Sequence, residues 1–121
     1  DMYRCAYLVK ETDEKIDKQN IAEYEKSYTN DNFDEEVRNK LFSDASIISL
    51  ELYNQTILNN ASYINMDNND WIKDNNEYKV MTMNNEFTSV DSAKTYIVLK
   101  LNGNVTVSGG NGTQLKPYVL N

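Results

Sequence analysis

Apolar side chains are scarce in this 121-residue chain, and many of them are aromatic. Hydrophobic residues make up 40% of the sequence, and the mean hydropathy is -0.70. Nine tyrosines, three phenylalanines and one tryptophan supply much of the area that can be buried. Such rings fill a small core, while Tyr and Trp keep one polar atom for a hydrogen bond. Because a chain of this length encloses one modest core rather than two, we expect a single domain over residues 1–121.

The last third of the chain has the pattern of β-structure. Its short segments are rich in β-branched and aromatic residues and are separated by turn signals. Asn102 and Gly103 both tolerate positive φ, so this pair predicts a hairpin. The glycines of residues 108–112 predict a second turn rather than a phosphate loop, because the Lys-Ser/Thr pair of such a loop is missing. We expect antiparallel strands at residues 77–83, 95–101, 104–107 and 118–120.

Helix signals lie in the N-terminal half. Asn32 is suited to cap a helix over residues 33–42, whose first turn is acidic and whose last turn is basic, as the helix dipole favours. Ser49 is suited to cap a second, shorter helix that ends at Asn59 and Asn60. We expect both helices to pack an apolar face against the sheet.

The remaining segments are less regular. Residues 10–32 fit either an amphipathic helix or a long turn, and residues 2–9 fit either a strand or a short buried helix. Residues 45–50 predict a short buried strand, and the Asn- and Asp-rich residues 61–76 predict an ordered loop. The sequence therefore predicts a small α+β domain with helices in the N-terminal half and an antiparallel sheet in the C-terminal half.

The absence of histidine limits the chemistry open to this chain. It removes Ser-His-Asp and Cys-His catalysis, histidine metal sites and the commonest general base. The adjacent carboxylates of residues 34–36 match a helix start rather than a catalytic pair, whose members come from separate elements and face a cleft. We therefore expect no enzymatic activity and no cofactor.

The chain is acidic, with a formal net charge of -7 and an isoelectric point of about 4.5. A surface of this sign repels phosphate backbones, so we expect no nucleic-acid partner. No apolar run is long enough to cross a bilayer; the longest is the interrupted stretch of residues 96–101. Cys5 is the only cysteine, and we expect it to be buried, with a disulfide to a cysteine outside this sequence as the alternative.

One segment combines aromatic and polar side chains in the manner of a ligand-binding site. Trp71, the only tryptophan, lies in a region rich in Asn and Asp. Rings surrounded by amide and carboxylate groups are suited to stacking on a carbohydrate and hydrogen-bonding its hydroxyl groups. The same rings also clamp a long polar loop onto a small core, which is the interpretation that we favour for Trp71. The candidate ligand-binding residues are Tyr63, Asp70, Trp71 and Tyr78.

The same region offers oxygen ligands for calcium. A regular EF-hand loop is excluded, because its fifth and sixth positions are Trp71 and Ile72 instead of an oxygen ligand and glycine. An irregular calcium site is left as the alternative to a solvated polar loop, which we favour. The oxygen donors are Asp67, Asn68, Asn69, Asp70, Asp74 and Glu77.

The C-terminal segment resembles the ending of a large group of proteins. Residues 99–113 read Leu-Lys-Leu-Asn-Gly-Asn-Val-Thr-Val-Ser-Gly-Gly-Asn-Gly-Thr, and residues 117–120 read Pro-Tyr-Val-Leu. Uncharacterised surface and secreted proteins of low-GC Gram-positive bacteria similarly end in Leu-Lys, Val-x-Ile, Gly-x-Gly-Thr and Asn-Pro-Tyr-x-Leu. The likeness covers about residues 45–121. It implies an extracellular or cell-surface location and, because many members look C-type-lectin-like, a fold used for display and binding.

Together these observations predict a non-catalytic extracellular or cell-surface domain for binding or adhesion, with a protein or a carbohydrate as its ligand. A structural subunit of a pilus-like or other assembled surface structure is the alternative. In that case an exposed edge in the hairpin of residues 95–107 is the surface for self-association.

Overall fold

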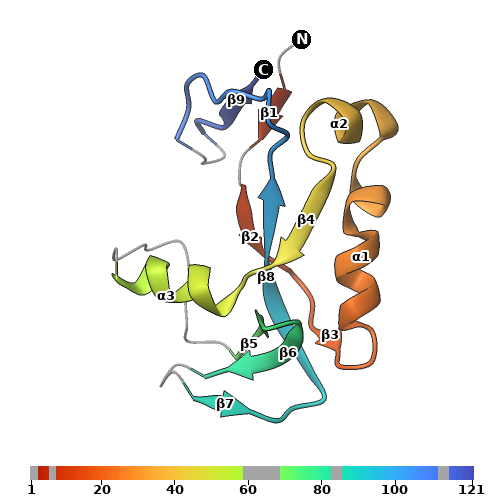
Figure 1. Cartoon of the computed structure of the whole chain (residues 1–121), viewed down its shortest axis with the longest axis vertical. Coiled ribbons are helices and arrows are strands. Elements are labelled where there is room, and N and C mark those ends of the chain that lie inside the picture. Colours follow the sequence, from red (N-terminus) through yellow and green to blue (C-terminus); the bar gives the residue numbers. More distant parts are fainter. Residues whose placement is uncertain (1–2, 6–7, 59–68, 83–85, 112–114) are drawn as a thin grey trace.

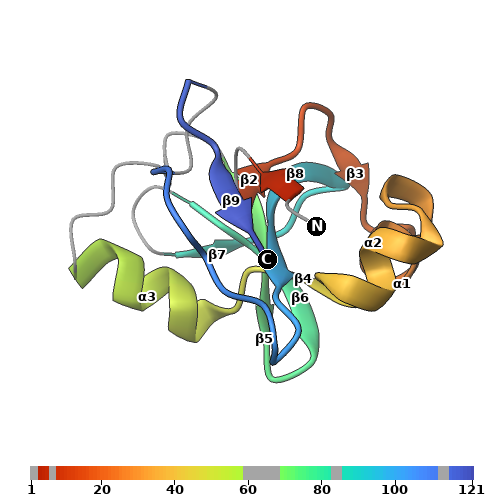
Figure 2. The ribbon, with the colours of Figure 1, turned by 90° about the horizontal axis from the view of Figure 1, so that it is seen from above.

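The fold is a mixed β-sheet with helices on both sides. The computed structural model describes residues 3–5, 8–58, 69–82, 86–111 and 115–121. Among these residues, α1 and α2 lie on one side of the sheet and α3 lies on the other (Figure 1; Figure 2). The prediction of a small α+β domain is therefore confirmed. The elements are β1 (Tyr3–Cys5), β2 (Val9–Glu11), β3 (Ile16–Asp17), α1 (Ile21–Asn32), α2 (Glu35–Lys40), β4 (Asp44–Ile47), α3 (Leu50–Leu58), β5 (Asp70–Asp74), β6 (Glu77–Met81), β7 (Phe87–Thr88), β8 (Ser92–Lys100) and β9 (Tyr118–Leu120).

The long strand β8 is the centre of the sheet. β2 pairs antiparallel with one edge of β8, and β3 continues along that edge. The other edge is shared, because β4 pairs antiparallel with the C-terminal part of β8 and β5 pairs parallel with its N-terminal part. β6 and β7 extend the sheet outward from β5. Both faces of β8 are covered, so Ile97 packs toward α1 while its neighbour Tyr96 packs toward α3.

The prediction of a loop over residues 61–76 is wrong for its C-terminal part. β5 and β6 form a hairpin through Asn75 and Asn76. These asparagines have φ values of 49 and 69, the geometry of a type I′ turn. Trp71 and Ile72 are both buried because the sheet is covered on both faces, so no alternation of apolar and polar residues marks the strand.

The predicted hairpin between residues 95–101 and 104–107 is also wrong. Asn102 does begin a turn, and its carbonyl oxygen accepts the Val105 N–H at 3.0 Å. The chain then leaves β8 and pairs with β9, through a bridge between Val107 and Leu120. Because β2 and β4 already occupy both edges of β8, no edge is left for a hairpin partner.

The N-terminal half contributes strands as well as helices, so the sheet is not confined to the C-terminal half. Residues 2–9 follow the strand alternative in their described part, which includes β1 and the start of β2. Cys5 lies in β1, and its side chain is outside the described part of the chain. Residues 10–32 follow the helix alternative from Ile21 onward. β4 (Asp44–Ile47) confirms the first part of the strand predicted at residues 45–50, whereas Leu50 begins α3.

The cap predicted for α3 is confirmed, whereas the cap predicted for α2 is wrong. Ser49 caps α3, and its Oγ accepts the Leu52 N–H at 3.0 Å. α2 begins later than predicted, with Asp34 rather than Asn32 as its cap. The Asp34 carboxylate accepts the Val37 N–H at 2.9 Å, whereas Asn32 is the last residue of α1. None of the described helices is long and apolar enough to span a membrane.

Glycine is required at position 110, where the C-terminal segment folds back on Pro117. The φ of Gly110 is +81, and a Cβ added there would lie 2.0 Å from the Pro117 carbonyl oxygen. We expect Gly110→Ala to lower the free energy of unfolding by about 2 kcal/mol, because the backbone must both shift and hold a left-handed conformation. Gly103→Ala is the matched control, since a Cβ there meets no atom within 4 Å. Urea denaturation of the two variants checks this, and equal stabilities would contradict it.

Candidate functional site

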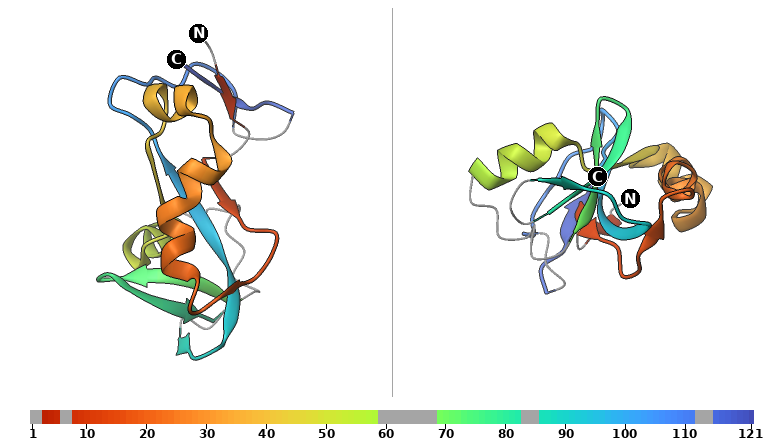
Figure 3. Two further views of the ribbon diagram at one scale, coloured as in Figure 1. Left: turned by 90° about the vertical axis from the view of Figure 1, so that its right-hand side faces the viewer. Right: turned by 90° about the horizontal axis from the view of Figure 1, so that it is seen from below.

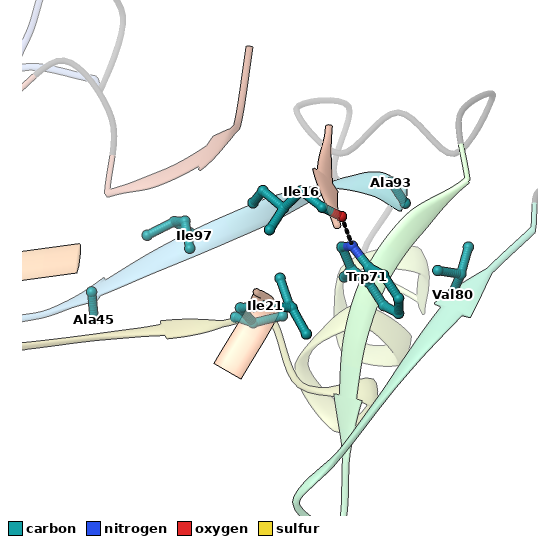
Figure 4. Packing of buried hydrophobic residues seen from close by; sticks show 8 residues of the cluster. Ile16, Ile21, Ala45, Trp71, Val80, Ala93 and Ile97 are labelled. Atoms are coloured by element: carbon teal, nitrogen blue, oxygen red, sulfur yellow. Dashed lines mark hydrogen bonds between the residues drawn. The ribbon is translucent and has the colours of Figure 1, made fainter. Parts of the chain in front are cut away.

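Trp71 is part of the hydrophobic core. Its side chain is only 2% exposed and packs with Ile16, Ile21 and Val80 (Figure 4). The indole N–H donates a hydrogen bond to the Ile16 carbonyl oxygen at 2.9 Å, which joins β5 to β3. A ring buried to this extent offers no open face to a ligand. Its position agrees with the interpretation that Trp71 clamps its segment onto the core.

Tyr78 belongs to a polar cluster centred on Glu25 of α1. The Tyr78 hydroxyl donates to Glu25 Oε1, and Lys73 Nζ lies 2.9 Å from the same oxygen. The Ile47 N–H donates to Glu25 Oε2 at 2.8 Å. Glu25 therefore joins α1 to the outer edge of β4 and to the β5–β6 hairpin. Its hydrogen bonds reach 22, 48 and 53 positions along the chain, so no local sequence signal marks this residue.

The Glu25 cluster is held in one protonation state near neutral pH. Burial alone would raise the pKa of Glu25, but the hydrogen bonds from Tyr78, Lys73 and the Ile47 N–H outweigh burial, and the pKa is lowered. Burial, together with the hydrogen bond to Glu25 and its charge, raises the pKa of Tyr78 to about 12. The carboxylate is thus charged and the phenol neutral, and both serve to fasten the helix to the sheet.

Asp70 is buried beside a second carboxyl group, that of Glu11. Asp70 pairs with Lys94 and Glu11 pairs with Tyr96, so both acids project from the α3 side of the sheet, one on each side of β8. Asp70 is 1% exposed, and neither of its carboxyl oxygens meets a hydrogen-bond donor among the described residues. Glu11 Oε2 is buried in the same way. A buried carboxyl group without a donor, next to a second acid, favours its protonated form.

Asp70 therefore holds a proton at neutral pH. Burial, followed by the neighbouring Glu11 carboxyl group, raises the pKa of Asp70 to about 8, and the opposing effect of Lys94 is smaller. Because the Asp70 side chain is closed off from solvent, the pair acts on the stability of the sheet.

The other acids of this region do not converge on a metal site. Asp74 and Glu77 both face Lys79, whose Nζ lies 3.2 Å from Asp74 Oδ2 and 3.7 Å from Glu77 Oε2. In the part of the chain that the structure describes, no group of three or more His, Cys, Asp or Glu side chains is placed to hold a metal ion. Calcium binding by the Asn- and Asp-rich segment stays a prediction. Of the predicted ligand residues, Tyr63, Asp67 and Asn68 lie outside the described residues.

Trp71 and Tyr78 are brought together at the border of a shallow hollow. Phe87, whose side chain is 47% exposed, lies on the same border, and Lys79 Nζ sits 4.6 Å from the centre of its ring. The hollow has a volume of about 260 Å³. Ligand pockets usually measure roughly 300 to 1,000 Å³, so this hollow is small for a ligand site.

The segment that leads from β2 to β3 runs beside α1 (Figure 3), and residues of both line a larger groove. Its volume is about 550 Å³, within the usual range for a ligand site. One wall is formed by residues 10–17, and Ile97 of β8 also lines the groove. The other wall is a row of α1 side chains at every fourth position, Asn20, Tyr24, Tyr28 and Asn32.

Aromatic and acidic groups meet within this groove. The rings of Tyr24 and Tyr28 make an edge-to-face pair with centroids 5.7 Å apart. Burial, the neighbouring Tyr28 and the Asp13 carboxylate raise the pKa of Tyr24. Both tyrosines are half-buried, whereas Asn20 and Asn32 at the ends of the row are exposed. The groove thus has aromatic surface at its middle and amide groups at its ends.

No family model, curated protein or solved structure matches this chain. The likeness of its C-terminal motif to surface proteins of Gram-positive bacteria, and the C-type-lectin-like fold that the likeness implies, therefore stay predictions.

A sequence pattern marks the row of side chains that forms the helix wall of the groove. Asn20, Tyr24, Tyr28 and Asn32 recur at every fourth position, which places them on one helix face. No local pattern marks the facing wall of residues 10–17, because this segment meets the helix only through the pairing of β2 and β3 with β8.

Proposed function

We propose that this chain is a non-catalytic binding domain that acts outside the cell or on the cell surface. The observation that carries this proposal is the groove between α1 and residues 10–17. Its lining is mainly polar, with lysine, amide and carboxylate groups around two tyrosine rings, and its volume lies within the usual range for a ligand site. The resemblance of the C-terminal motif supports the location.

The state of the buried acids supports a role without catalysis. The Asp70 carboxyl group is closed off from solvent and paired with Glu11. The Glu25 carboxylate accepts three hydrogen bonds, which occupy both of its oxygens. A general acid or base must instead reach the proton that it transfers, within hydrogen-bonding distance of a bound substrate. Neither of these two buried acids lines the groove.

A self-assembling surface subunit is less well supported. That function depends on an exposed edge in a hairpin of residues 95–107, and the described strands do not form this hairpin. We therefore favour the binding domain.

Binding at the groove is tested by NMR. Neutral sugars, amines, carboxylates and short peptides are titrated into the labelled protein, and the backbone amide signals are followed. We expect at least one of these classes to shift the signals of residues 12–17 and 20–32 together, because they form the two walls. Shifts confined to residues 87–90, beside the smaller hollow, would contradict the proposed site. If no class shifts any signal, the proposed function falls.

A further inference from the structure

The helix wall of the groove carries no charge. Its row runs amide, ring, ring, amide from Asn20 to Asn32, a separation that covers about 18 Å of helix axis. Asn20 is the N-cap residue of α1, but its side chain makes no capping hydrogen bond. Its amide is therefore available to a ligand, and the row as a whole suits an elongated molecule.

The facing wall carries both signs of charge. Lys10 and Lys15 lie on it together with Asp13, Glu14 and Asp17. A strongly charged ligand would meet like charges as well as opposite ones along this wall, which lowers the gain from ion pairing. A hydroxyl group both donates and accepts, so it can pair with the lysines, the carboxylates and the amides alike. The wall thus favours a neutral ligand rich in hydroxyl groups.

The tyrosine pair completes the match to such a ligand. Tyr24 and Tyr28 present half-buried rings in the middle of the row, in edge-to-face contact with each other. The C–H face of a sugar ring is apolar, and it packs on an aromatic ring while the hydroxyl groups at its rim reach the polar residues.

We propose that the groove binds a linear oligosaccharide of neutral sugars, with sugar rings packed on Tyr24 and Tyr28 and hydroxyl groups bound by Asn20, Asp13 and the side-chain oxygen of Asn32. The Asn32 amide nitrogen donates to the Tyr28 carbonyl oxygen at 2.8 Å. The assignment of a sugar rests on the proposed function as a binding domain and adds the class of ligand. The site is distinct from the Trp71 region that the sequence indicates, because Trp71 is buried in the core.

The affinity test uses neutral β-linked glucose and N-acetylglucosamine tetramers as probes, measured by calorimetry at low and high salt. We expect binding that changes little with salt, because no ion pair is formed. A lysine-rich peptide and a glutamate-rich peptide serve as charged probes. Salt-sensitive binding of either peptide at the groove, without binding of the tetramers, overturns the sugar assignment and leaves the binding function standing.

Variants locate the site. Tyr24→Ala is expected to weaken tetramer binding about tenfold, and Tyr24→Phe, which keeps the ring, by no more than about threefold. Asn20→Ala is expected to weaken binding about fivefold through the loss of a hydrogen bond. Asn30→Ala is the matched control, because Asn30 is exposed on α1 but does not line the groove. Thermal denaturation checks that each variant is folded.

The outcomes separate the two proposals. Tetramer binding that survives both Tyr24→Ala and Asn20→Ala places the sugar elsewhere and overturns the inference. If neither the tetramers nor the peptides bind and no NMR probe shifts the groove signals, the proposed function fails together with the inference.

Discussion

Replacing Asp70 with asparagine is expected to stabilise the protein at alkaline pH. Asn has nearly the shape of Asp, and its amide N–H can donate to Glu11 without a proton that titrates. In the wild type, loss of the Asp70 proton leaves a buried charge that meets no donor among the described residues. We expect Asp70→Asn to raise the free energy of unfolding by about 3 kcal/mol at a pH of about 8.5.

Asp70 makes the folded state bind a proton more tightly than the unfolded chain does. Its pKa is about 8 in the fold, against an ordinary value of 3.8. Between these values the folded protein holds a proton that the unfolded chain has released. The stability of the wild type therefore falls as the pH rises through this window, by up to about 1.4 kcal/mol for each pH unit.

Glu25 has the opposite effect at lower pH. Its pKa is lowered from 4.5, so the stability that it contributes is complete above that value and is lost as the pH falls. The two acids together place the maximum of stability in mildly acidic solution. Asp70→Asn should leave the acid limb of this curve unchanged and flatten the alkaline limb.

Chemical denaturation at a series of pH values from about 5 to about 9 measures this prediction. Asp74→Asn is the matched control on the same strand, because Asp74 forms an ion pair with Lys79 at 3.2 Å and is 24% exposed. This variant should lose no more than about 1 kcal/mol at every pH. A wild type that grows more stable from mild acid to mild alkali, with Asp70→Asn less stable throughout, would show that Asp70 is ionised in the fold.

Features governed by a few neighbouring residues could be predicted from the sequence. The cap at Ser49 is an example, because a helix start depends on a side-chain oxygen and an N–H three positions later. The same rule explains the displaced start of α2. Asn32 and Asp34 are both good caps, and the choice between them depends on where α1 ends, which the local pattern does not contain.

Features governed by partners far along the chain could not be predicted. β5 has no alternation because α1 and α3 cover both faces of the sheet, and its Asn- and Asp-rich surroundings have the composition of a loop. The segment of residues 104–107 has the composition of a hairpin strand, yet β2 and β4 hold both edges of β8. Which strand pairs with each edge of β8 depends on the whole sheet, so the local sequence does not determine it.

The candidate site divides in the same way. The four positions of the α1 row share one face through helix periodicity, so the chemistry of that wall was present in the sequence. The Glu11–Asp70 pair was not, because the two acids meet only once β2 and β5 have paired with β8. Aromatic and acidic residues that are close in sequence, such as Asp70 and Trp71, project to opposite faces of the sheet. Closeness in sequence therefore pointed to a site that the fold separates.

Replacing Trp71 with alanine is expected to be among the most destabilising single changes in this chain. The side chain is 2% exposed, and its removal leaves a large cavity in the cluster shared with Ile16 and Val80. We expect Trp71→Ala to cost about 4 kcal/mol, close to the whole stability of a small domain. Trp71→Phe should cost about 2 kcal/mol, because it keeps a ring but leaves the Ile16 carbonyl oxygen without its donor.

An aromatic residue at the surface provides the contrast. Phe87 borders the same hollow as Trp71, but its side chain is 47% exposed, so Phe87→Ala should cost less than about 1 kcal/mol. Urea denaturation followed by circular dichroism measures all three variants without relying on Trp fluorescence. If Trp71 were a surface residue for ligand stacking, Trp71→Ala and Phe87→Ala would have similar small effects. A large difference between them instead places the only tryptophan in the core, and leaves the tyrosine row of α1 as the aromatic surface on which a ligand can pack.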